Sequence, residues 1–178
     1  MNLLHSINAF GNDNTVNVVV EIPKGSNKKT EYKVDQEKFV LDRVLSSKLS
    51  FPFNYGFVPE TWSNDNDPLD VAIISSKTFP TGTVLQARIV GLLETIDQSG
   101  KDGKLIVVPF SEKDPVFTAI QNTDSLDKDT LANIEYFYKN YKINEPGKWV
   151  DINGYLSIDK AKITLNEAIK RYHQHFQK

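Results

Sequence analysis

The sequence contains no cysteine in its 178 residues. Disulfides, thiolate nucleophiles and cysteine-based zinc sites are therefore excluded, and a reducing cytoplasm is the expected compartment. No apolar run approaches the roughly 20 residues that a helix needs to cross a bilayer. Positive charge is not in excess either, because 21 Lys and Arg stand against 23 Asp and Glu, for a formal net charge of −2. General binders of nucleic acids or membrane surfaces usually carry a basic excess, so neither partner is expected.

The first ten residues have no basic segment followed by an apolar one, so we expect no secretory signal. The composition, with 39% hydrophobic and 25% charged residues, is typical of a globular chain rather than a disordered one. Neither an internal repeat nor a low-complexity linker marks a boundary. We expect one domain over residues 1–178.

Strands are predicted in the first two thirds of the chain, where β-branched and aromatic residues cluster between Gly, Pro, Asn and Asp. They cover residues 16–22, 38–45, 69–74, 83–93 and 104–110. Residues 98–104 are expected to form a hairpin connection, because the Asp-Gly pair at 102–103 tolerates positive φ.

Helical periodicity follows in residues 125–143 and 158–176, where apolar residues recur every three to four positions. Asp124 or Ser125 is expected to cap the first of these helices. A twisted sheet or barrel with two principal helices packed outside it follows from this order of elements. The predicted fold class is α+β.

Three aspartates, Asp65, Asp67 and Asp70, precede a buried-type strand in "DNDPLDV". Carboxylate oxygens are hard ligands, and several together suit Mg²⁺, Mn²⁺ or Ca²⁺. In an extended segment the first two share a face, and a bend at Pro68 could return the third toward them. The segment therefore indicates a metal site, with a solvated turn as the alternative.

A calcium loop of the EF-hand type fails on spacing. Counted from Asp65, Leu69 stands where the third oxygen ligand belongs and Ser76 stands where the bidentate glutamate belongs.

A second acidic segment contains Asp97 and Asp102, and by itself it could be an ordinary hairpin turn. The functional interpretation gains support from charged residues at strand positions elsewhere, which could face the same cleft. These residues are Glu21, Lys29, Glu31 and Arg43, the last in a segment otherwise suited to burial.

The segment "DNDPLDV" matches the signature Asp-x-Asp-Pro-x-Asp-Val of the soluble family I inorganic pyrophosphatases of the bacterial type. Four more segments resemble blocks of that family, in the same order. They are "EIPKGSNKKTE" (21–31), "LDRVLSSKLSFPFNYGFVPET" (41–61), "DQSGKDGKLIVVP" (97–109) and "FYKNYKINEPGKWV" (137–150). Five ordered blocks rarely agree by chance, and together they span most of the chain.

The resemblance implies a five-stranded OB-like β-barrel with flanking strands and helices, and hydrolysis of pyrophosphate to two phosphates. It implies several Mg²⁺ ions, with Mn²⁺ or Zn²⁺ as substitutes, and a homo-oligomer, with a hexamer favoured. By motif position the metal carboxylates are Asp65, Asp70, Asp97, Asp102, Glu21 and Glu31. Asp67 takes the place of the general base. The residues at positions that hold phosphate oxygens are Lys29, Arg43, Tyr55, Lys104, Tyr141 and Lys142, and Lys148 belongs to a matching block without an assigned role.

The chain departs from the family pattern at three positions. Thr30 replaces a tyrosine or large apolar residue, Phe51 replaces a tyrosine, and Gln98 replaces a glutamate. None of these changes removes a predicted metal carboxylate.

Other interpretations are weaker. A metal phosphohydrolase for nucleotides or polyphosphate would be expected to have a Gly-rich phosphate loop, which this sequence does not contain. A single-strand binder of the OB type could use the aromatic run "FPFNYGF" for stacking, but the acidic balance opposes it. Tyr141 and Lys142 could simply end a helix. His5, His173 and His175 are expected to be ordinary surface histidines.

Overall fold

The computed structural model describes residues 1–110 and 112–177. Its strands are β1 (Val16–Ile22), β2 (Lys28–Lys33), β3 (Lys38–Val44), β4 (Asn54–Phe57), β5 (Asp70–Ile73), β6 (Val84–Asp97), β7 (Gly100–Pro109) and β8 (Val150–Leu156). Its α-helices are α1 (Lys128–Asn140) and α2 (Ile158–Phe176), and short 3₁₀ turns lie at Val34–Gln36, Pro115–Phe117 and Thr123–Ser125. Within these residues no helix is both long and apolar enough to pass through a bilayer.

Five strands close into a barrel. They hydrogen-bond in the order β1-β4-β5-β7-β6, and β6 pairs again with β1 to complete the ring. Only the β5–β7 pair is parallel among the pairings of this ring. The long β6 pairs with β1, β7 and β8, and its register against β7 shifts between Ile89 and Gly91, where the strand can bend.

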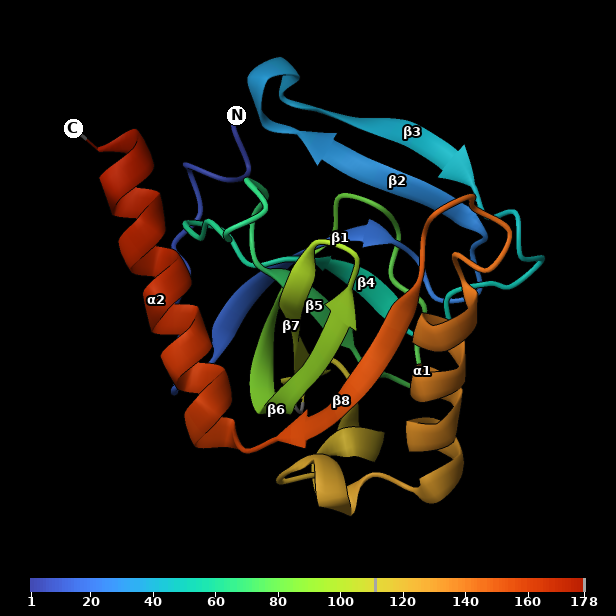
Figure 1. The fold of residues 1–178 in the computed structure, drawn as a ribbon. Coiled ribbons are helices and arrows are strands. Elements are labelled where there is room, and N and C mark those ends of the chain that lie inside the picture. The colour runs from blue at the N-terminus through green and yellow to red at the C-terminus, as the bar shows by residue number, and fades with distance from the viewer. Residues whose placement is uncertain (111, 178) are drawn as a thin grey trace.

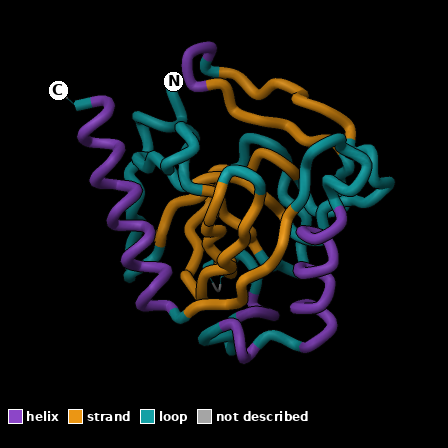
Figure 2. The backbone as a smooth tube through the Cα atoms, in the orientation of Figure 1, coloured by secondary structure: helices purple, strands orange, loops and turns teal. Residues whose placement is uncertain are grey.

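The remaining elements lie outside the ring. β8 pairs with β6, and β2 and β3 form a separate hairpin. In Figure 1, α2 and α1 stand on opposite sides of the barrel and the β2–β3 hairpin extends above it. The tube in Figure 2 shows the same layout, with loops concentrated around the hairpin end of the barrel. The predicted α+β fold, a five-stranded OB-like barrel with flanking strands and two outer helices, is confirmed.

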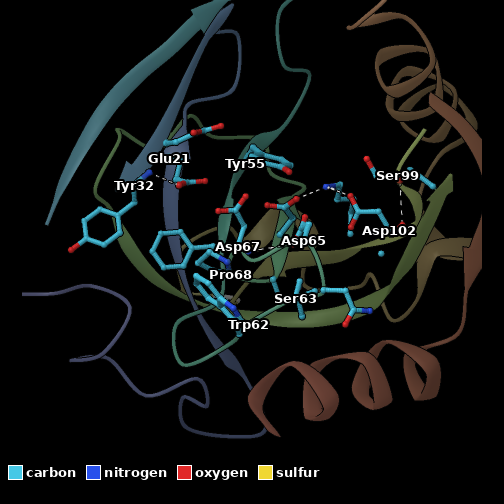
Figure 3. A pocket seen from close by; sticks show the side chains of 18 of the residues that line it. Glu21, Tyr32, Tyr55, Trp62, Ser63, Asp65, Asp67, Pro68, Ser99 and Asp102 are labelled. Atoms are coloured by element: carbon cyan, nitrogen blue, oxygen red, sulfur yellow. Dashed lines mark hydrogen bonds and ion pairs between the residues drawn. The ribbon is translucent and has the colours of Figure 1, made fainter. Parts of the chain in front are cut away.

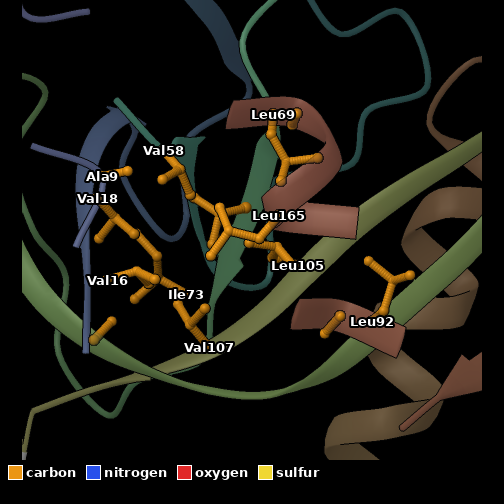
Figure 4. Packing of buried hydrophobic residues seen from close by; sticks show 14 of the residues in the cluster. Ala9, Val16, Val18, Val58, Leu69, Ile73, Leu92, Leu105, Val107 and Leu165 are labelled. Atoms are coloured by element: carbon orange, nitrogen blue, oxygen red, sulfur yellow. The ribbon is translucent and has the colours of Figure 1, made fainter. Parts of the chain in front are cut away.

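The central strands are buried on both faces, which explains their continuous apolar runs. In β7, Leu105 and Val107 join one hydrophobic cluster, whereas Ile106 and Val108 join another. The first cluster is completed by α2 through residues such as Leu165 (Figure 4). The second is completed by α1 and is rich in aromatic rings. Side chains on the two faces of β7 therefore pack into different clusters, and each cluster is completed by a different helix.

Gly56 of β4 lies where the backbone of β1 leaves no room for a side chain. A Cβ atom at this position would lie 1.8 Å from the carbonyl oxygen of Val19 in β1. Gly56→Ala is expected to destabilise the fold by about 3 kcal/mol, because backbone rather than a side chain would have to move. Urea unfolding measures the loss. Gly103→Ala is the matched control in β7, where the new methyl meets only the movable Leu92 side chain at 3.3 Å.

A Gly56→Ala protein as stable as the parent would contradict this account of barrel closure. The control should lose clearly less, because a leucine side chain can shift by a few tenths of an ångström.

Several predicted elements are correct, and the differences have local causes. The predicted strand at 16–22 and the helix at 158–176 have the observed bounds, while β6 extends four residues beyond its predicted end. Three strands were not predicted, namely β2, β4 and β8. β2 ("KKTEYK") is mostly charged and β8 ("VDINGYL") contains Asp, Asn and Gly, which are depleted in strands, so propensity did not reveal them.

Three predictions about turns, caps and strand burial are wrong. The Asp102-Gly103 pair lies within β7, and the turn is formed by residues 98 and 99 between β6 and β7. The first helix is capped by Asp127, whose side chain accepts from the Thr130 amide, because residues 123–125 form a separate 3₁₀ turn. Burial of the strand containing Arg43 is also not observed, since β3 belongs to the outer hairpin and is mostly exposed.

Candidate active site

A cleft of about 1300 Å³ lies where the barrel, the β2–β3 hairpin and the C-terminal ends of both helices face one another. Every residue that the sequence assigned to metal, substrate or proton transfer lines this cleft. They are Glu21, Lys29, Glu31, Arg43, Tyr55, Asp65, Asp67, Asp70, Asp97, Asp102, Lys104, Tyr141 and Lys142. Lys148 lines it as well. The tertiary structure thus brings together residues more than 120 positions apart, and their individual roles stay predictions.

The barrel supplies side chains from positions that its core holds rigid. Asp70 is the first residue of β5, immediately before the buried run Val71–Ile73, and Lys104 precedes the buried run of β7. Glu21 lies at an irregularity of the β1–β4 register, between Val20 and Ile22. Irregularities of this kind redirect a side chain, which explains how a residue in an apolar strand faces the cleft.

The hairpin supplies a second group of charges. Lys29 and Glu31 share a face of β2, and Arg43 lies opposite Lys29 on β3. The register shifts after this pair, so that Asp42 is the extra residue of β3. Lys29 forms ion pairs with Glu31 and, at 3.5 Å, with Asp42, while Arg43 Nε lies 3.1 Å from Glu145 Oε1. These contacts hold the cationic side chains in place.

Asp65 and Asp67 belong to a tight turn, so the extended geometry assumed for them is wrong. The Ser63 amide donates to the Asp67 carbonyl at 2.8 Å, and the Asp67 amide donates to Asp65 Oδ1 at 3.3 Å. Asn66 adopts a positive φ of 65°, which asparagine tolerates better than most residues. Figure 3 shows both carboxylates at the cleft surface, with Pro68 beside them and Glu21, Tyr55 and Asp102 around them.

Lys104 lies between two of the carboxylates. Its ammonium group contacts Asp70 and lies 2.6 Å from Asp102 Oδ2, although the residue is only 7% exposed. Burial alone would lower the pKa of Lys104, but the charge of Asp70, with Tyr55 and Asp102, holds that pKa well above its usual value. Lys104 is therefore a permanent cation at the centre of the site.

A second lysine–aspartate pair, with a longer separation, lies elsewhere in the cleft. Lys142 Nζ lies 3.6 Å from Asp97 Oδ2, and the Ser99 amide donates to Asp97 Oδ1 at 2.7 Å. Tyr141 stacks on Phe137 of α1, with ring centroids 5.1 Å apart. The end of α1 is thereby placed over the β6–β7 turn.

The crowded carboxylates disfavour one another's ionised forms. Burial raises the pKa of Glu21 to about 8. The Tyr32 amide donates a hydrogen bond to Glu21 at 2.7 Å, which favours the charged form and opposes part of this rise. Asp67 is exposed to the cleft, but loss of hydration raises its pKa to about 6, and the charges of Asp65 and Asp70 add to the rise. A bound cation would relieve this repulsion between the carboxylates, so the site favours cations.

The donor chemistry fits hard divalent cations, because the acidic ligands are all carboxylates and no cysteine is present. The contacts of Lys104 also show that this site holds positive charge, since its ammonium group bridges Asp70 and Asp102. Within residues 1–110 and 112–177, no three acidic or histidine side chains converge closely enough to hold one ion.

Residues 18–173 match the sequence family described as inorganic pyrophosphatase. The chain belongs to this family. An inorganic pyrophosphatase from Saccharolobus solfataricus is 42% identical over 159 residues, covering 89% of this chain and 92% of the relative.

Solved structures agree with the sequence relatives. An inorganic pyrophosphatase from Helicobacter pylori superposes with a TM-score of 0.90 at 38% identity, covering 95% of this chain and 99% of the other. One from Thermus thermophilus gives a TM-score of 0.90 at 34% identity, covering 97% and 99%. The resemblance to inorganic pyrophosphatases inferred from the motifs is confirmed.

The three departures from the motifs of the inorganic pyrophosphatase family have structural counterparts. Phe51 is buried and packs against the rings of Phe53, Tyr55 and Phe137, so no hydroxyl is required there. Gln98 accepts a hydrogen bond from the Trp149 amide at 3.3 Å. Thr30 follows the register shift of the hairpin, opposite Leu41. None of these contacts disturbs a cleft carboxylate.

Three residues that shape this cleft were not predicted from the sequence. Asp42 and Glu145 pair with its cations, and Asp42 could have been suspected from its place beside Arg43. Trp62 lines the cleft next to the turn that carries Asp65 and Asp67, and it lies outside the family motifs of the sequence. His5, His173 and His175 are exposed, as predicted.

Proposed function

We propose that this protein hydrolyses inorganic pyrophosphate to two phosphates with Mg²⁺ as cofactor. The observation that carries the proposal is one cleft in which the six predicted metal carboxylates and Asp67 lie among lysine, arginine and tyrosine donors. Pyrophosphate is a dense anion, and its hydrolysis needs positive charge on the substrate and on the leaving phosphate. Membership of the inorganic pyrophosphatase family gives independent support.

The residues that would hold Mg²⁺ are Asp65, Asp70, Asp97 and Asp102, with Glu21 and Glu31 at the edge of the site. When bound, Mg²⁺ neutralises charge on the phosphate oxygens and makes the attacking water more acidic.

The remaining side chains of the cleft bind the substrate and move a proton. Lys29 and Arg43 reach the cleft from the hairpin, and Lys142 reaches it from the end of α1, so phosphate oxygens can be held from two sides. A carboxylate oxygen of Asp67 accepts the proton of the attacking water. The water oxygen bonds to one phosphorus, and the bond from that phosphorus to the bridging oxygen breaks. The leaving phosphate keeps the electron pair.

Metal identity provides the first functional test. With Mg²⁺ the protein is expected to release phosphate from pyrophosphate, whereas Ca²⁺ alone should give little or none. Ca²⁺ takes 6–8 oxygen ligands at longer distances and would displace the reacting groups. Phosphate release is measured with each ion alone, and comparable turnover with Ca²⁺ would contradict the proposed metal chemistry.

Substrate choice separates the competing functions. Pyrophosphate should be cleaved in preference to ATP and tripolyphosphate, and single-stranded DNA should not shift in a gel. Preferred hydrolysis of ATP or tripolyphosphate would support the wider phosphohydrolase function instead. DNA binding without hydrolysis would support the single-strand binder. The cytoplasmic location and the homo-oligomer, with a hexamer favoured, stay predictions.

A further inference from the structure

The turn that presents Asp65 and Asp67 is a small closed unit. Its first and last residues are joined by the hydrogen bond from the Ser63 amide to the Asp67 carbonyl, and the Asn66 amide returns to the Ser63 carbonyl at 3.2 Å. We call residues 63–67 the aspartate turn. Because it is closed on itself, its direction relative to the cleft depends on how it is attached to the rest of the fold.

One attachment connects the aspartate turn to the barrel. The Leu69 amide donates to Thr61 Oγ1 at 2.9 Å, and the Val58 amide donates to the Leu69 carbonyl at 3.0 Å. Thr61 and Leu69 are both buried. This attachment fixes Thr61 and Leu69, which flank the aspartate turn, to the barrel. The angle between the turn and the cleft is set by other contacts.

The other attachment runs through Trp62 to α2. The Trp62 amide donates to the Ala168 carbonyl at 2.9 Å. Its indole stacks on the His175 ring at a centroid distance of 5.2 Å and an interplanar angle of 20°, and it meets the Phe176 ring edge-on at 4.9 Å. In Figure 3, Trp62 and Ser63 lie on the helix side of the aspartates. The residue next to the turn is therefore held by the last two turns of α2.

The end of α2 is itself fixed to the core. Tyr172 is buried in a cluster with Leu4 and Phe57, to which Trp62 also packs. The Tyr172 hydroxyl lies 2.8 Å from His5 Nδ1, and the His5 ring packs on Phe176 at 4.8 Å. The N-terminal segment thus packs against the same helix end through His5.

We propose that Trp62 is a positioning residue. Its stack on His175 and its edge-on contact with Phe176 fix the angle at which the aspartate turn presents Asp65 and Asp67 to the cleft. Trp62 Nε1 is buried and has no hydrogen-bond partner within the described residues. Beyond the backbone hydrogen bond to Ala168, the side chain therefore attaches through its ring contacts rather than through the indole N–H. The consequence for catalysis rests on the proposed function.

The test compares Trp62→Ala, Trp62→Phe and His175→Ala, with His173→Ala as matched control. His173 lies on the same helix end, but its ring nitrogen contacts Gln177 and its side chain is exposed. Mg²⁺ affinity is measured by calorimetry without substrate, and kcat and KM for pyrophosphate are measured at saturating Mg²⁺. Thermal unfolding of each variant identifies any loss of the fold.

Trp62→Ala is expected to weaken Mg²⁺ binding and lower kcat by about 10-fold each, because displaced supporting groups typically cost that much. KM for pyrophosphate should change little, since other elements carry the phosphate contacts. Trp62→Phe should restore Mg²⁺ affinity and kcat to within about twofold, because stacking is retained. His175→Ala should show an intermediate loss, and His173→Ala should match the parent.

A folded Trp62→Ala protein with parental Mg²⁺ affinity and kcat would overturn the positioning role. If that variant does not fold, His175→Ala decides, and parental values in it would also overturn the role. Trp62→Phe behaving like Trp62→Ala would show that stacking is not the attachment. If the parent does not hydrolyse pyrophosphate, the proposed function fails, while the calorimetric comparison still tests the position of the turn.

Discussion

Asp67→Asn is expected to lower pyrophosphate turnover at neutral pH by about 10²–10⁴-fold, the usual contribution of a general base. The amide oxygen can still accept a hydrogen bond, but it cannot take the proton of the attacking water. Asp67 lies on the exposed aspartate turn, so the fold should be retained, and surface substitutions of this kind usually change stability by less than about 0.5 kcal/mol. Mg²⁺ affinity should fall little, because the neighbouring carboxylates remain.

The pH–rate profile distinguishes this role from a structural one. Part of the loss should be recovered as pH rises, because hydroxide needs no proton acceptor. The profile of Asp67→Asn is measured beside that of the parent at saturating Mg²⁺. Asp35→Asn is the matched control, since Asp35 also lines the cleft but lies in the 3₁₀ turn of the hairpin. An Asp67→Asn protein with the parental rate and profile would assign the proton to another group.

Asp70→Asn and Arg43→Ala are expected to impair different properties, namely Mg²⁺ binding in the first and the catalytic step in the second. Asp70→Asn should reduce Mg²⁺ affinity by about 10- to 100-fold, because a neutral amide is a poorer ligand and its neighbours lose their arrangement. Lys104 keeps Asp102 as a partner, so the buried ammonium is not left alone. Arg43→Ala should leave the affinity of the resting protein for Mg²⁺ nearly unchanged, yet lower kcat by about 10²–10³-fold through lost charge stabilisation.

Calorimetric titration with Mg²⁺ and steady-state kinetics of both variants separate the two roles. Arg43 lies in the outer hairpin and pairs with Glu145, so its loss should not disturb the barrel carboxylates. Equal losses of Mg²⁺ affinity in the two variants would contradict the division between metal ligands and phosphate contacts.

Segments with a continuous apolar run or a regular amphipathic pattern were predictable from the sequence. The β1 strand "VNVVVEI" and the two-sided runs of β5 and β7 are apolar because the barrel and both helices enclose them. The amphipathic α2 begins after Ser157, whose side chain caps it, and its predicted bounds are the observed ones. The acidic motifs also identified the family, since carboxylates placed at strand entrances serve chemistry rather than packing.

Pairings between distant segments were decided only in three dimensions. The charged β2 forms a strand because β3 supplies its hydrogen bonds. The β-propensity of the β2 residues themselves does not reveal that such a partner exists. Register shifts direct Glu21 and Asp42 out of regular strand order, and a period-two pattern cannot show them. The turn between β6 and β7 likewise follows from strand register rather than from the nearby Asp-Gly pair.

The sequence by itself determined which chemical groups this protein has: hard oxygen ligands, phosphate-binding cations and no thiols. Only the tertiary structure decided which of these groups meet. It placed Lys104 between Asp70 and Asp102, and it stacked Trp62 on the end of α2, more than 100 residues further along the chain. The physical reason is that ion pairs and ring stacking depend on distances of a few ångströms, which barrel closure and helix docking set together.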